Sequence, residues 1–303
     1  MHSTVITIGT FDGVHIGHRK ILERLSKSAT ELRLKSTVLT FFPHPRMVLQ
    51  KDADIKLLST VEEKIKILEQ SGLDFLIIHP FTQKFSRLSA TEFVRDLLVN
   101  SLRAKKIIIG YDHRFGRNRN ANITDLIAFG TTLDFEVEEI SAQEIDDVSV
   151  SSTKIRKALE EGNVQTANAY LGYHYMLTGT VKKGKGIGRQ LNFPTANIHI
   201  EESYKLIPKN GSYIVQSKIG QRIIYGMMNI GFNPTISEKE ASGKRKESIE
   251  VHFFEFNENL YDQTLQIDIL QRLRDEQKFE SVDALKEQLA KDKEKSLAII
   301  SGK

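Results

Sequence analysis

The sequence predicts an α/β domain followed by a smaller β domain, and three observations lead to this fold class. Short apolar segments alternate with helical patterns through the first half of the chain, whereas strand patterns follow one another in the second half. The change between the two patterns falls near Gly172. At 303 residues, of which 40% are hydrophobic, the chain is long enough for about two domains.

The first half contains apolar segments that are typical of buried strands, several of them apolar at consecutive positions. They cover residues 5–8, 37–42, 75–78, 106–109 and 135–140. Between them, Thr60 and Ser89 each begin a capping-box pattern ahead of an amphipathic segment, and Gly72 can end the first of these helices. The repeated alternation of strand and helix predicts a Rossmann-like, doubly wound parallel sheet, whose ligands bind at the carboxyl ends of the strands.

The second half follows a predicted helix over 152–171 that ends at Gly172. Strand patterns then cover 175–181, 212–219, 223–230, 249–256 and 265–270, with a tight hairpin connection at Gly220-Gln221. A last helix over about 281–300 carries an apolar face suited to packing on a small barrel. We therefore expect two domains, 1–172 and 173–303, the second an antiparallel β-barrel with a terminal helix.

Composition limits the classes of partner. The formal charge of +4 and the pI near 9.0 favour phosphorylated ligands, but 39 acidic residues are interleaved with the basic ones, so nucleic acid is not the expected partner. The chain has no cysteine, which fits a reducing compartment. The first predicted strand begins almost at Met1 and no apolar run approaches the ~20 residues of a membrane span. We expect a cytoplasmic protein without a signal peptide.

A phosphate-binding turn is predicted at Gly9-Thr10-Phe11-Asp12-Gly13-Val14-His15-Ile16-Gly17-His18, between the first strand and the following helix. Its glycines allow the backbone to approach an anion, and the helix N-terminus presents unpaired N–H groups. Two imidazoles three positions apart can face that anion. The pattern suits nucleotidyl transfer, in which fixed donors stabilise charge at the α-phosphate. The plain alternative is an ordinary strand-to-helix turn with two solvent-facing histidines.

Two further segments follow strands of the predicted sheet. Phe42-Pro43-His44-Pro45 comes after the second strand, and Gly110-Tyr111-Asp112-His113-Arg114-Phe115-Gly116 comes after the fourth. His44 is rigidly placed between prolines, either for a ligand or for turn geometry alone. In the second half, Gly184-Lys185-Gly186-Ile187-Gly188-Arg189 can also cradle phosphates, although it lacks the Ser/Thr and the helix of a Walker loop.

Together with Ser151-Ser152-Thr153-Lys154-Ile155-Arg156, Phe193-Pro194-Thr195-Ala196-Asn197 and Leu273-Arg274-Asp275-Glu276, these segments resemble the bifunctional bacterial riboflavin kinase/FAD synthetase family over nearly the whole chain. The resemblance implies that the C-terminal domain phosphorylates riboflavin to FMN with ATP. It implies that the N-terminal domain then joins FMN and ATP to give FAD and pyrophosphate. The H-x-G-H element alone specifies only a superfamily, whereas Pro-Thr-Ala-Asn within a β domain indicates the flavin kinase.

For the N-terminal domain, the resemblance implies that His15 and His18 hold the triphosphate and stabilise the pentavalent phosphorus. It also implies that Ser152, Thr153 and Arg156 close over the phosphates from the other side. A serine and a threonine at a helix start can cap it or bind an oxyanion, and an arginine one turn later offers a bidentate fork. A simple cap with a surface arginine is the alternative. The residues expected to bind nucleotide or flavin here are Gly9, Phe11, Asp12, Gly13, Gly17, His44, Asp112, Ser152 and Thr153.

For the C-terminal domain, the resemblance places ATP at Gly184, Gly186, Gly188 and Arg189, with Thr195 and Asn197 as Mg²⁺ ligands. Hydroxyl and amide oxygens are hard donors suited to that cation. Strand alternation puts Glu250 and His252 on one face, and Glu250 is the expected base for the ribityl 5′-hydroxyl. Arg274, with Phe279, is expected to help cover the flavin. The alternative for Thr195 and Asn197 is a turn after a β-edge proline. The alternative for Glu250 is a solvent-facing strand glutamate, and the alternative for Arg274 is an exposed arginine.

Departures from the family pattern are His113, Ala121 and Asn192, which leave the catalytic groups in place. Two other function classes remain open: a flavin-sensing module descended from the enzyme, and an RNA-linked synthetase using the same H-x-G-H element. A sensor need not keep a base and metal ligands, and no Lys-Met-Ser-Lys-Ser-like loop is visible for a synthetase. We expect ATP, riboflavin and FMN as partners, no nucleic acid or membrane partner, and a monomer or weak homo-oligomer.

Overall fold

The structure is a computed structural model that describes residues 2–50, 54–111, 113–141, 150–184, 186, 188, 191–232 and 247–302. It divides into two compact units, Met1–Ser152 and Thr153–Lys303. Each unit is described by itself. No helix of the described residues is long and apolar enough to cross a membrane.

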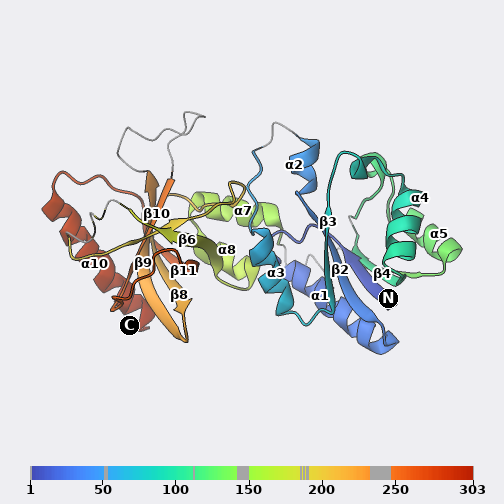
Figure 1. Cartoon of the computed structure of the whole chain (residues 1–303), viewed down its shortest axis with the longest axis horizontal. Helices are drawn as coiled ribbons and strands as arrows, with labels where there is room; N and C mark the ends of the chain where they lie inside the picture. The colour runs from blue at the N-terminus through green and yellow to red at the C-terminus, as the bar shows by residue number, and fades with distance from the viewer. Residues whose placement is uncertain are drawn as a thin grey trace. The chain divides into compact units, whose positions relative to one another are not determined.

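The first unit is built on a five-stranded parallel sheet, as predicted (Figure 1). Its strands are β1 (Thr4–Ile8), β2 (Lys35–Phe42), β3 (Phe75–Pro80), β4 (Ala104–Gly110) and β5 (Glu136–Ile140), in the order β3-β2-β1-β4-β5. The strand order reverses at β1, which lies between β2 and β4. In a doubly wound sheet such a reversal opens a crevice at the carboxyl ends of the strands, and there the chain leaves β1.

Helices cover both faces of this sheet. Figure 1 shows α1 (Ile16–Leu32) and α3 (Val61–Glu69) on one face, and α4 (Ala90–Glu92) and α5 (Ile123–Leu133) on the other. The remaining turns of this unit are α2 (Pro45–Leu49), η1 (Phe85–Arg87) and η3 (Arg117–Arg119). Buried side chains of β1, β4 and the second group of helices form one core, including Ile6, Ile107, Val94, Leu98 and Leu126.

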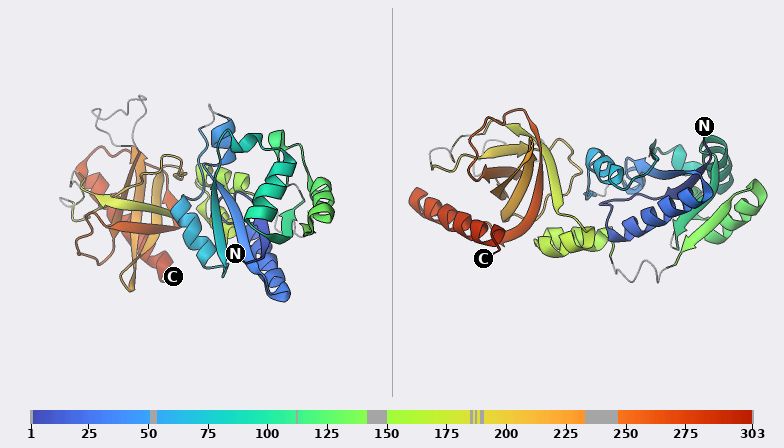
Figure 2. Two further views of the ribbon diagram at one scale, coloured as in Figure 1. Left: turned by 45° about the vertical axis from the view of Figure 1, so that its right-hand side comes forward. Right: turned by 90° about the horizontal axis from the view of Figure 1, so that it is seen from below.

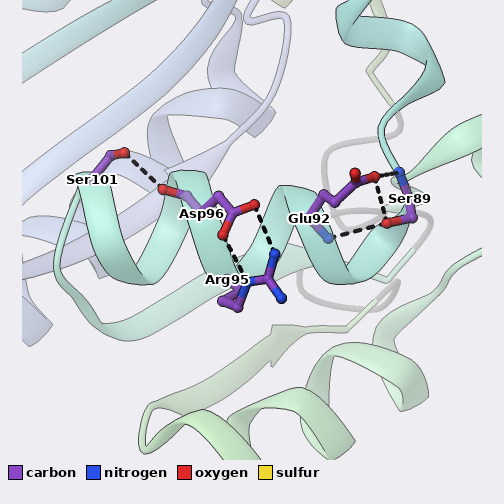
Figure 3. Close-up of polar contacts among 5 residues, drawn as sticks. All are labelled: Ser89, Glu92, Arg95, Asp96 and Ser101. Carbon is purple, nitrogen blue, oxygen red and sulfur yellow. Dashed lines mark hydrogen bonds and ion pairs between the residues drawn. The ribbon is translucent and has the colours of Figure 1, made fainter.

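The helix that begins at Ala90 continues as a π-helix, η2 (Phe93–Ser101). Both halves of the predicted capping box are present: Glu92 N donates to Ser89 Oγ at 3.2 Å, and Ser89 N donates to Glu92 Oε2 at 2.8 Å (Figure 3). Five residues apart, Ser101 Oγ donates to the Asp96 carbonyl at 2.7 Å, which follows the wider π spacing. The Thr60–Glu63 capping box of α3 is likewise confirmed.

The second unit is a closed six-stranded barrel, which confirms the predicted β domain (Figures 1 and 2). Around the barrel the strand order is β10-β7-β6-β11-β8-β9, and these neighbouring strands pair antiparallel. The strands are β6 (Tyr175–Lys182), β7 (Ala196–His199), β8 (Gly211–Ile219), β9 (Arg222–Phe232), β10 (Glu247–Phe253) and β11 (Thr264–Arg274). β10 ends before the predicted 256 because Glu255 has a φ of 52°, outside the extended region.

The predicted helical stretch over 152–171 is divided into two helices, α7 (Ser152–Glu161) and α8 (Val164–Leu171), a break that the sequence did not indicate. Gly162 has a φ of +83°, and Asn163 caps the second helix by accepting a hydrogen bond from Thr166 N at 3.2 Å. Asn168 ties α8 to the barrel: its Nδ2 donates to the Ile269 carbonyl at 2.9 Å. The second unit begins at Thr153 and so includes α8 and all of α7 after Ser152, whereas the sequence suggested a boundary at 172/173.

The terminal helix α10 (Val282–Ile300) is capped by Ser281, whose Oγ accepts from Ala284 N at 3.1 Å. Figure 2 shows it along the outside of the barrel, and a buried ion pair holds it there. The Arg274 guanidinium of β11 donates to Asp292 through Nε at 2.9 Å and Nη2 at 2.7 Å. Asp292 also accepts from Gln288 Nε2 at 2.8 Å, so its carboxylate is multiply bonded.

Two candidate active sites

The turn after β1 holds an uncommon backbone conformation. Phe11, Gly13 and Val14 have φ values of 46°, 79° and 36°, in the left-handed region. Glycine adopts this region freely, whereas the region costs free energy for a phenylalanine or a β-branched valine. Gly9 adds a close approach, because a Cβ atom there would lie 3.0 Å from the Phe11 ring. Strained turns of this kind persist where surrounding contacts hold them, and they concentrate at functional sites.

His15 and His18 form one stacked pair, with ring centroids 3.7 Å apart and planes inclined by 17°. His15 is the N-cap of α1, and its Nδ1 accepts a hydrogen bond from His18 N at 3.4 Å. His18 Nδ1 is buried without a hydrogen-bond partner among the described residues. The structure therefore brings together the two imidazoles that the sequence singled out, at the N-terminus of helix α1, whose second residue is the buried Gly17.

Both imidazoles are neutral near pH 7. Burial lowers the pKa of His15 to about 4, although the Asp12 carboxylate acts in the opposite direction. Burial lowers the pKa of His18 well below its ordinary value, and the neighbouring His15 and Lys64 lower it further. A neutral imidazole still has one N–H donor and one acceptor nitrogen. The pair can therefore hold an oxyanion through hydrogen bonds, rather than as two cations.

Asp12 and Ser152 make contacts that build the turn. Asp12 is 2% exposed, and its Oδ1 accepts a hydrogen bond from Leu58 N at 2.9 Å. Its backbone carbonyl accepts from Ser152 Oγ at 3.0 Å. We expected both residues to contact nucleotide. In the structure they bind the protein's own backbone, which suits a role in shaping the turn.

Thr40 and Lys64 complete this turn, although neither was predicted from the sequence. The Thr10 carbonyl accepts from Lys64 Nζ at 2.8 Å and from Thr40 Oγ1 at 3.1 Å. Lys64 is only 7% exposed. One signal could have found it, because Lys64 shares the buried face of α3 with Glu63, Ile67 and Leu68. A lysine on an apolar helix face needs a partner.

His44, Thr153, Arg156 and Asp112 were also predicted to belong to the N-terminal site. His44 is the N-cap of α2, with its Nδ1 accepting from Arg46 N at 3.2 Å, so its ring has a turn-forming role. Thr153 and Arg156 lie on α7 in the second unit, the threonine exposed and the arginine half-buried. Asp112 lies outside the described residues.

A group of half-buried rings, which we call the aromatic group, follows the ends of β2 and β3. The ring centroids of Phe41 lie 5.8 Å from Phe81 and 5.6 Å from Phe85, and those of His79 and Phe85 lie 4.3 Å apart. The sequence analysis did not identify this group, because its members come together only when neighbouring strands pair. Half-buried aromatic faces at this edge of the sheet can stack on a flat ligand.

In the barrel, a row of polar side chains crosses three neighbouring strands. Glu250 of β10 lies directly opposite Asn197 of β7 on one side and Asn229 of β9 on the other. Directly opposed residues share a face of the sheet. Thr195 joins this row, since its Oγ1 donates to Glu250 Oε2 at 3.1 Å. The predicted base and the two predicted metal ligands are therefore neighbours, and Asn229 is an addition that the sequence did not suggest.

The glycine-rich loop packs tightly against this row. A Cβ atom on Gly184 would lie 2.2 Å from Asn197 Nδ2, and one on Gly188 would lie 2.3 Å from the Phe193 carbonyl and 3.3 Å from Thr195 Oγ1. Gly186 has a φ of +73° and open space around it. Glycine is thus required at two positions by contact and at a third by conformation. Arg189 lies outside the described residues.

His252 and Asn192 support the Thr195 segment. The His252 ring is 8% exposed, and its Nδ1 donates to the Pro194 carbonyl at 2.9 Å. Burial lowers the pKa of His252, and the charge of Lys293 lowers it further, although the Pro194 hydrogen bond acts in the opposite direction. Asn192, which stands where the resembled family often has glycine, has a φ of 64° that asparagine tolerates.

The Arg274 side chain is engaged by Asp292, and its guanidinium carbon lies 5.8 Å from the centre of the Phe279 ring. We expected these residues to help cover a flavin. The structure shows them joined to each other and to α10, which gives Arg274 an anchoring contact. A role at the flavin remains a prediction.

Comparisons with known proteins agree with this division of sites. Residues 1–154 match the FAD synthetase family model, and residues 171–300 match the riboflavin kinase family model. A bifunctional riboflavin kinase/FMN adenylyltransferase from Buchnera aphidicola subsp. Schizaphis graminum is 37% identical over 292 residues, which are 96% of this chain and 92% of that protein. The chain belongs to this family. A member from Bacillus subtilis is 34% identical, over 98% of this chain and 93% of that protein.

A solved structure shares the whole architecture. It is named a macrolide-efflux protein from Streptococcus pneumoniae, with a TM-score of 0.85 and 30% identity, over 96% of this chain and 93% of that chain. The name of that structure differs from the enzyme name that the two relatives share. The chain is thus a bifunctional enzyme, with FAD synthetase before riboflavin kinase, which confirms the order that the sequence predicted.

Proposed function

We propose that the His15–His18 turn is the site of adenylyl transfer and that the Thr195–Asn197–Glu250 row is the site of riboflavin phosphorylation. The observation that carries the first assignment is the stacked, neutral imidazole pair at the N-terminus of α1. The observation that carries the second is the hydrogen bond between Thr195 and Glu250 beside a glycine-rich loop.

In adenylyl transfer, an FMN phosphate oxygen attacks the α-phosphorus of ATP, and pyrophosphate leaves. Negative charge grows on the α-phosphate oxygens as the new P–O bond forms. The N–H groups of the imidazole pair and of the first turn of α1 are preorganised donors for that charge. Their fixed geometry favours the transition state, because no reorientation is needed as the charge develops.

The aromatic group gives the FMN substrate a place in this unit. Its rings lie at the ends of β2 and β3, the same edge of the sheet at which β1 ends. A flavin is a large flat ring system, and stacking on Phe81 or Phe85 would hold it by dispersion and apolar burial. We propose that this group binds the isoalloxazine ring while the FMN phosphate reaches the turn.

In the kinase reaction, Glu250 accepts the proton of the ribityl 5′-hydroxyl as that oxygen attacks the γ-phosphorus and ADP leaves. The Thr195 hydroxyl, by donating to Glu250 Oε2, fixes the orientation of the carboxylate. Asn197 and Asn229, on either side of Glu250, add amide groups to the same face. The close contact of Gly184 with Asn197 keeps the phosphate-binding backbone beside this row.

The donor set of the row fits Mg²⁺ bound with ATP. Hydroxyl, amide and carboxylate oxygens are hard ligands, and Mg²⁺ commonly takes only one or two protein ligands beside water and phosphate. Among the described residues, no three His, Cys, Asp or Glu side chains gather to form a complete metal site. Thr195 and Asn197 would hold the cation, which when bound supplies charge neutralisation at the transferring phosphate.

Glu250→Gln tests the kinase assignment. The amide keeps the shape and can still contact Thr195, but it cannot accept a proton from the hydroxyl. We expect FMN formation from riboflavin and ATP to fall by roughly 100-fold or more, measured by separating the flavins after incubation with Mg²⁺. FAD formation from supplied FMN is the internal control and is expected to stay at the wild-type rate. Equal loss of both reactions would contradict the assignment of Glu250 to one site.

We further propose that ATP, riboflavin and FMN are the physiological partners, that the protein works in the cytoplasm, and that it does so as a monomer or weak homo-oligomer. A chain without cysteine is compatible with a reducing compartment where ATP is abundant. Gel filtration with light scattering, and cell fractionation, test the assembly and the location.

A further inference from the structure

Residues 58–64 form several hydrogen bonds to residues 10–13, in the turn that leads to His15 and His18. Leu58 N donates to Asp12 Oδ1 at 2.9 Å, Gly13 N donates to Ser59 Oγ at 3.4 Å, and Lys64 Nζ donates to the Thr10 carbonyl at 2.8 Å. The capping box of α3 lies between these contacts and fixes the segment itself. About fifty residues of chain separate the two partners of each contact, so each one depends on the completed fold.

Lys64 is the charged member of this segment. Its side chain comes from the buried face of α3, and only 7% of the residue is exposed. A buried ammonium is costly unless it is bonded and has a countercharge. The Thr10 carbonyl supplies the bond, and although burial lowers the pKa of Lys64, the Asp12 carboxylate acts in the opposite direction as a countercharge. An apolar residue at this position would avoid the free-energy cost of desolvating the ammonium, so stability alone does not explain the lysine.

The charge of Lys64 acts on the imidazole pair. Its positive charge lowers the pKa of His18, as does the neighbouring His15, whereas Asp12 raises the pKa of His15. The titratable groups that act on the pair are therefore Asp12 within the turn and Lys64 on α3. A fixed cation behind the turn favours an anionic ligand and disfavours a proton on His18.

We propose that Lys64 is a positioning residue for adenylyl transfer, which fixes the turn through the Thr10 carbonyl and places a buried positive charge beside the His15–His18 pair. The proposal rests on the function proposed above for that pair. It assigns no contact between Lys64 and the reacting atoms. Lys64 therefore affects both kcat for FAD formation and the pH below which kcat falls.

Three substitutions in the full chain separate the effects of contact and charge. Lys64→Met removes both, Lys64→Gln keeps an N–H donor without the charge, and Lys66→Met removes an exposed lysine of the same helix as a matched control. The measurements are kcat and KM for FAD formation from FMN and ATP across pH, with riboflavin phosphorylation by the same preparation as a control for folding and concentration.

We expect Lys64→Met to lower kcat for FAD formation by roughly 10-fold or more, since a displaced turn misaligns the transferring groups. Without the cation the pKa of His18 rises, and activity requires the neutral ring, so the acid limb of the kcat profile moves to higher pH in both Lys64 variants. Lys66→Met is expected to show the wild-type rate and profile. Riboflavin phosphorylation is expected to be unchanged in all three.

A wild-type rate and an unmoved acid limb in Lys64→Met would overturn the proposal. If that variant does not fold, Lys64→Gln decides: an upward shift of the limb supports the proposal, and an unmoved limb overturns it. His18→Ala separates this outcome from failure of the proposed function. A fully active His18→Ala would remove the role of the imidazole pair itself, whereas an inactive His18→Ala beside an unaltered Lys64→Gln removes only the role of Lys64.

Discussion

At the scale of single residues, the two proposed sites obtain their geometry from hydrogen bonds within the protein itself. His15 caps α1 by accepting a hydrogen bond from His18 N, and Asp12 accepts one from Leu58 N. The Thr195 hydroxyl donates a hydrogen bond to the carboxylate of Glu250. Each functional side chain is thus fixed before any substrate arrives. Catalysis by positioning and by fixed dipoles requires this order, because reorientation during the reaction would raise the barrier.

Replacing His18 by alanine removes one imidazole of the stacked pair. We expect FAD formation from FMN and ATP to fall by roughly 100-fold or more, since one fixed donor to the α-phosphate is lost. Riboflavin phosphorylation by the same protein is expected to remain at the wild-type rate, because that site lies in the other unit. Steady-state assays of each reaction check this, and FAD formation at the wild-type rate would refute the role of His18.

At Asn197, two substitutions distinguish an oxygen ligand from mere packing against Gly184. Asn197→Leu removes the donor, and we expect kinase activity to be nearly lost at every Mg²⁺ concentration. Asn197→Asp keeps an oxygen but adds charge beside the phosphates, and we expect partial activity that responds to added Mg²⁺. Phosphorylation of riboflavin by Asn197→Leu at the wild-type rate, with an unchanged circular dichroism spectrum, would exclude the metal-ligand role.

At the scale of elements, α10 depends on the Arg274–Asp292 pair, whose side chains are 16% and 5% exposed. Asp292→Ala leaves a buried guanidinium without its partner, which typically costs about 3–5 kcal/mol. We expect a clear fall in the urea midpoint for loss of kinase activity. Lys291→Ala, in the exposed pair with Glu287, is the matched control and should leave the midpoint nearly unchanged, because solvent screens an exposed pair. Equal midpoints in the two variants would show that the buried pair does not anchor the helix.

Elements whose pattern is continuous could be predicted, and elements that depend on distant partners could not. The apolar runs of β1, β2 and β4 indicate buried parallel strands because both faces are covered. The four residues of β7 carry an asparagine and a histidine, so only pairing with β6 and β10 makes them a recognisable strand. A single glycine within a helical pattern often leaves the helix unbroken, so the sequence did not predict the break at Gly162.

The same holds for the candidate sites: residues close together in sequence could be predicted, and residues brought together by the fold could not. The glycines and histidines of the β1 turn are adjacent in sequence, so their pattern predicts a phosphate site without any fold. Lys64, Asn229 and the aromatic group reach their sites through strand pairing and helix packing across long stretches of chain. Asp12 was expected at the nucleotide because its position in the motif cannot reveal that Leu58 N occupies one of its oxygens.

At the scale of the whole molecule, two units with separate cores make the activities separable. We expect a fragment of residues 153–303 to form FMN from riboflavin but no FAD. A fragment of residues 173–303 is expected to retain kinase activity but to unfold at a lower temperature, because it lacks the Asn168 bonds to Ile269 and Tyr175. Flavin separation and thermal melts test both fragments. FAD formation by either folded fragment would contradict the assignment of adenylyl transfer to the first unit.

Closure of the barrel also bears on how the protein avoids aggregation. A closed barrel has no free strand edge, whereas the parallel sheet of the first unit ends at β3 and β5. On β5, Glu136 and Glu139 are exposed, so a second copy adding its own β5 there would bring carboxylates against carboxylates. On β3, Pro80 ends the strand and lacks an N–H for a further ladder. The sheet edges thus resist edge-to-edge pairing through charge and through a missing donor, and the barrel avoids the hazard by its topology.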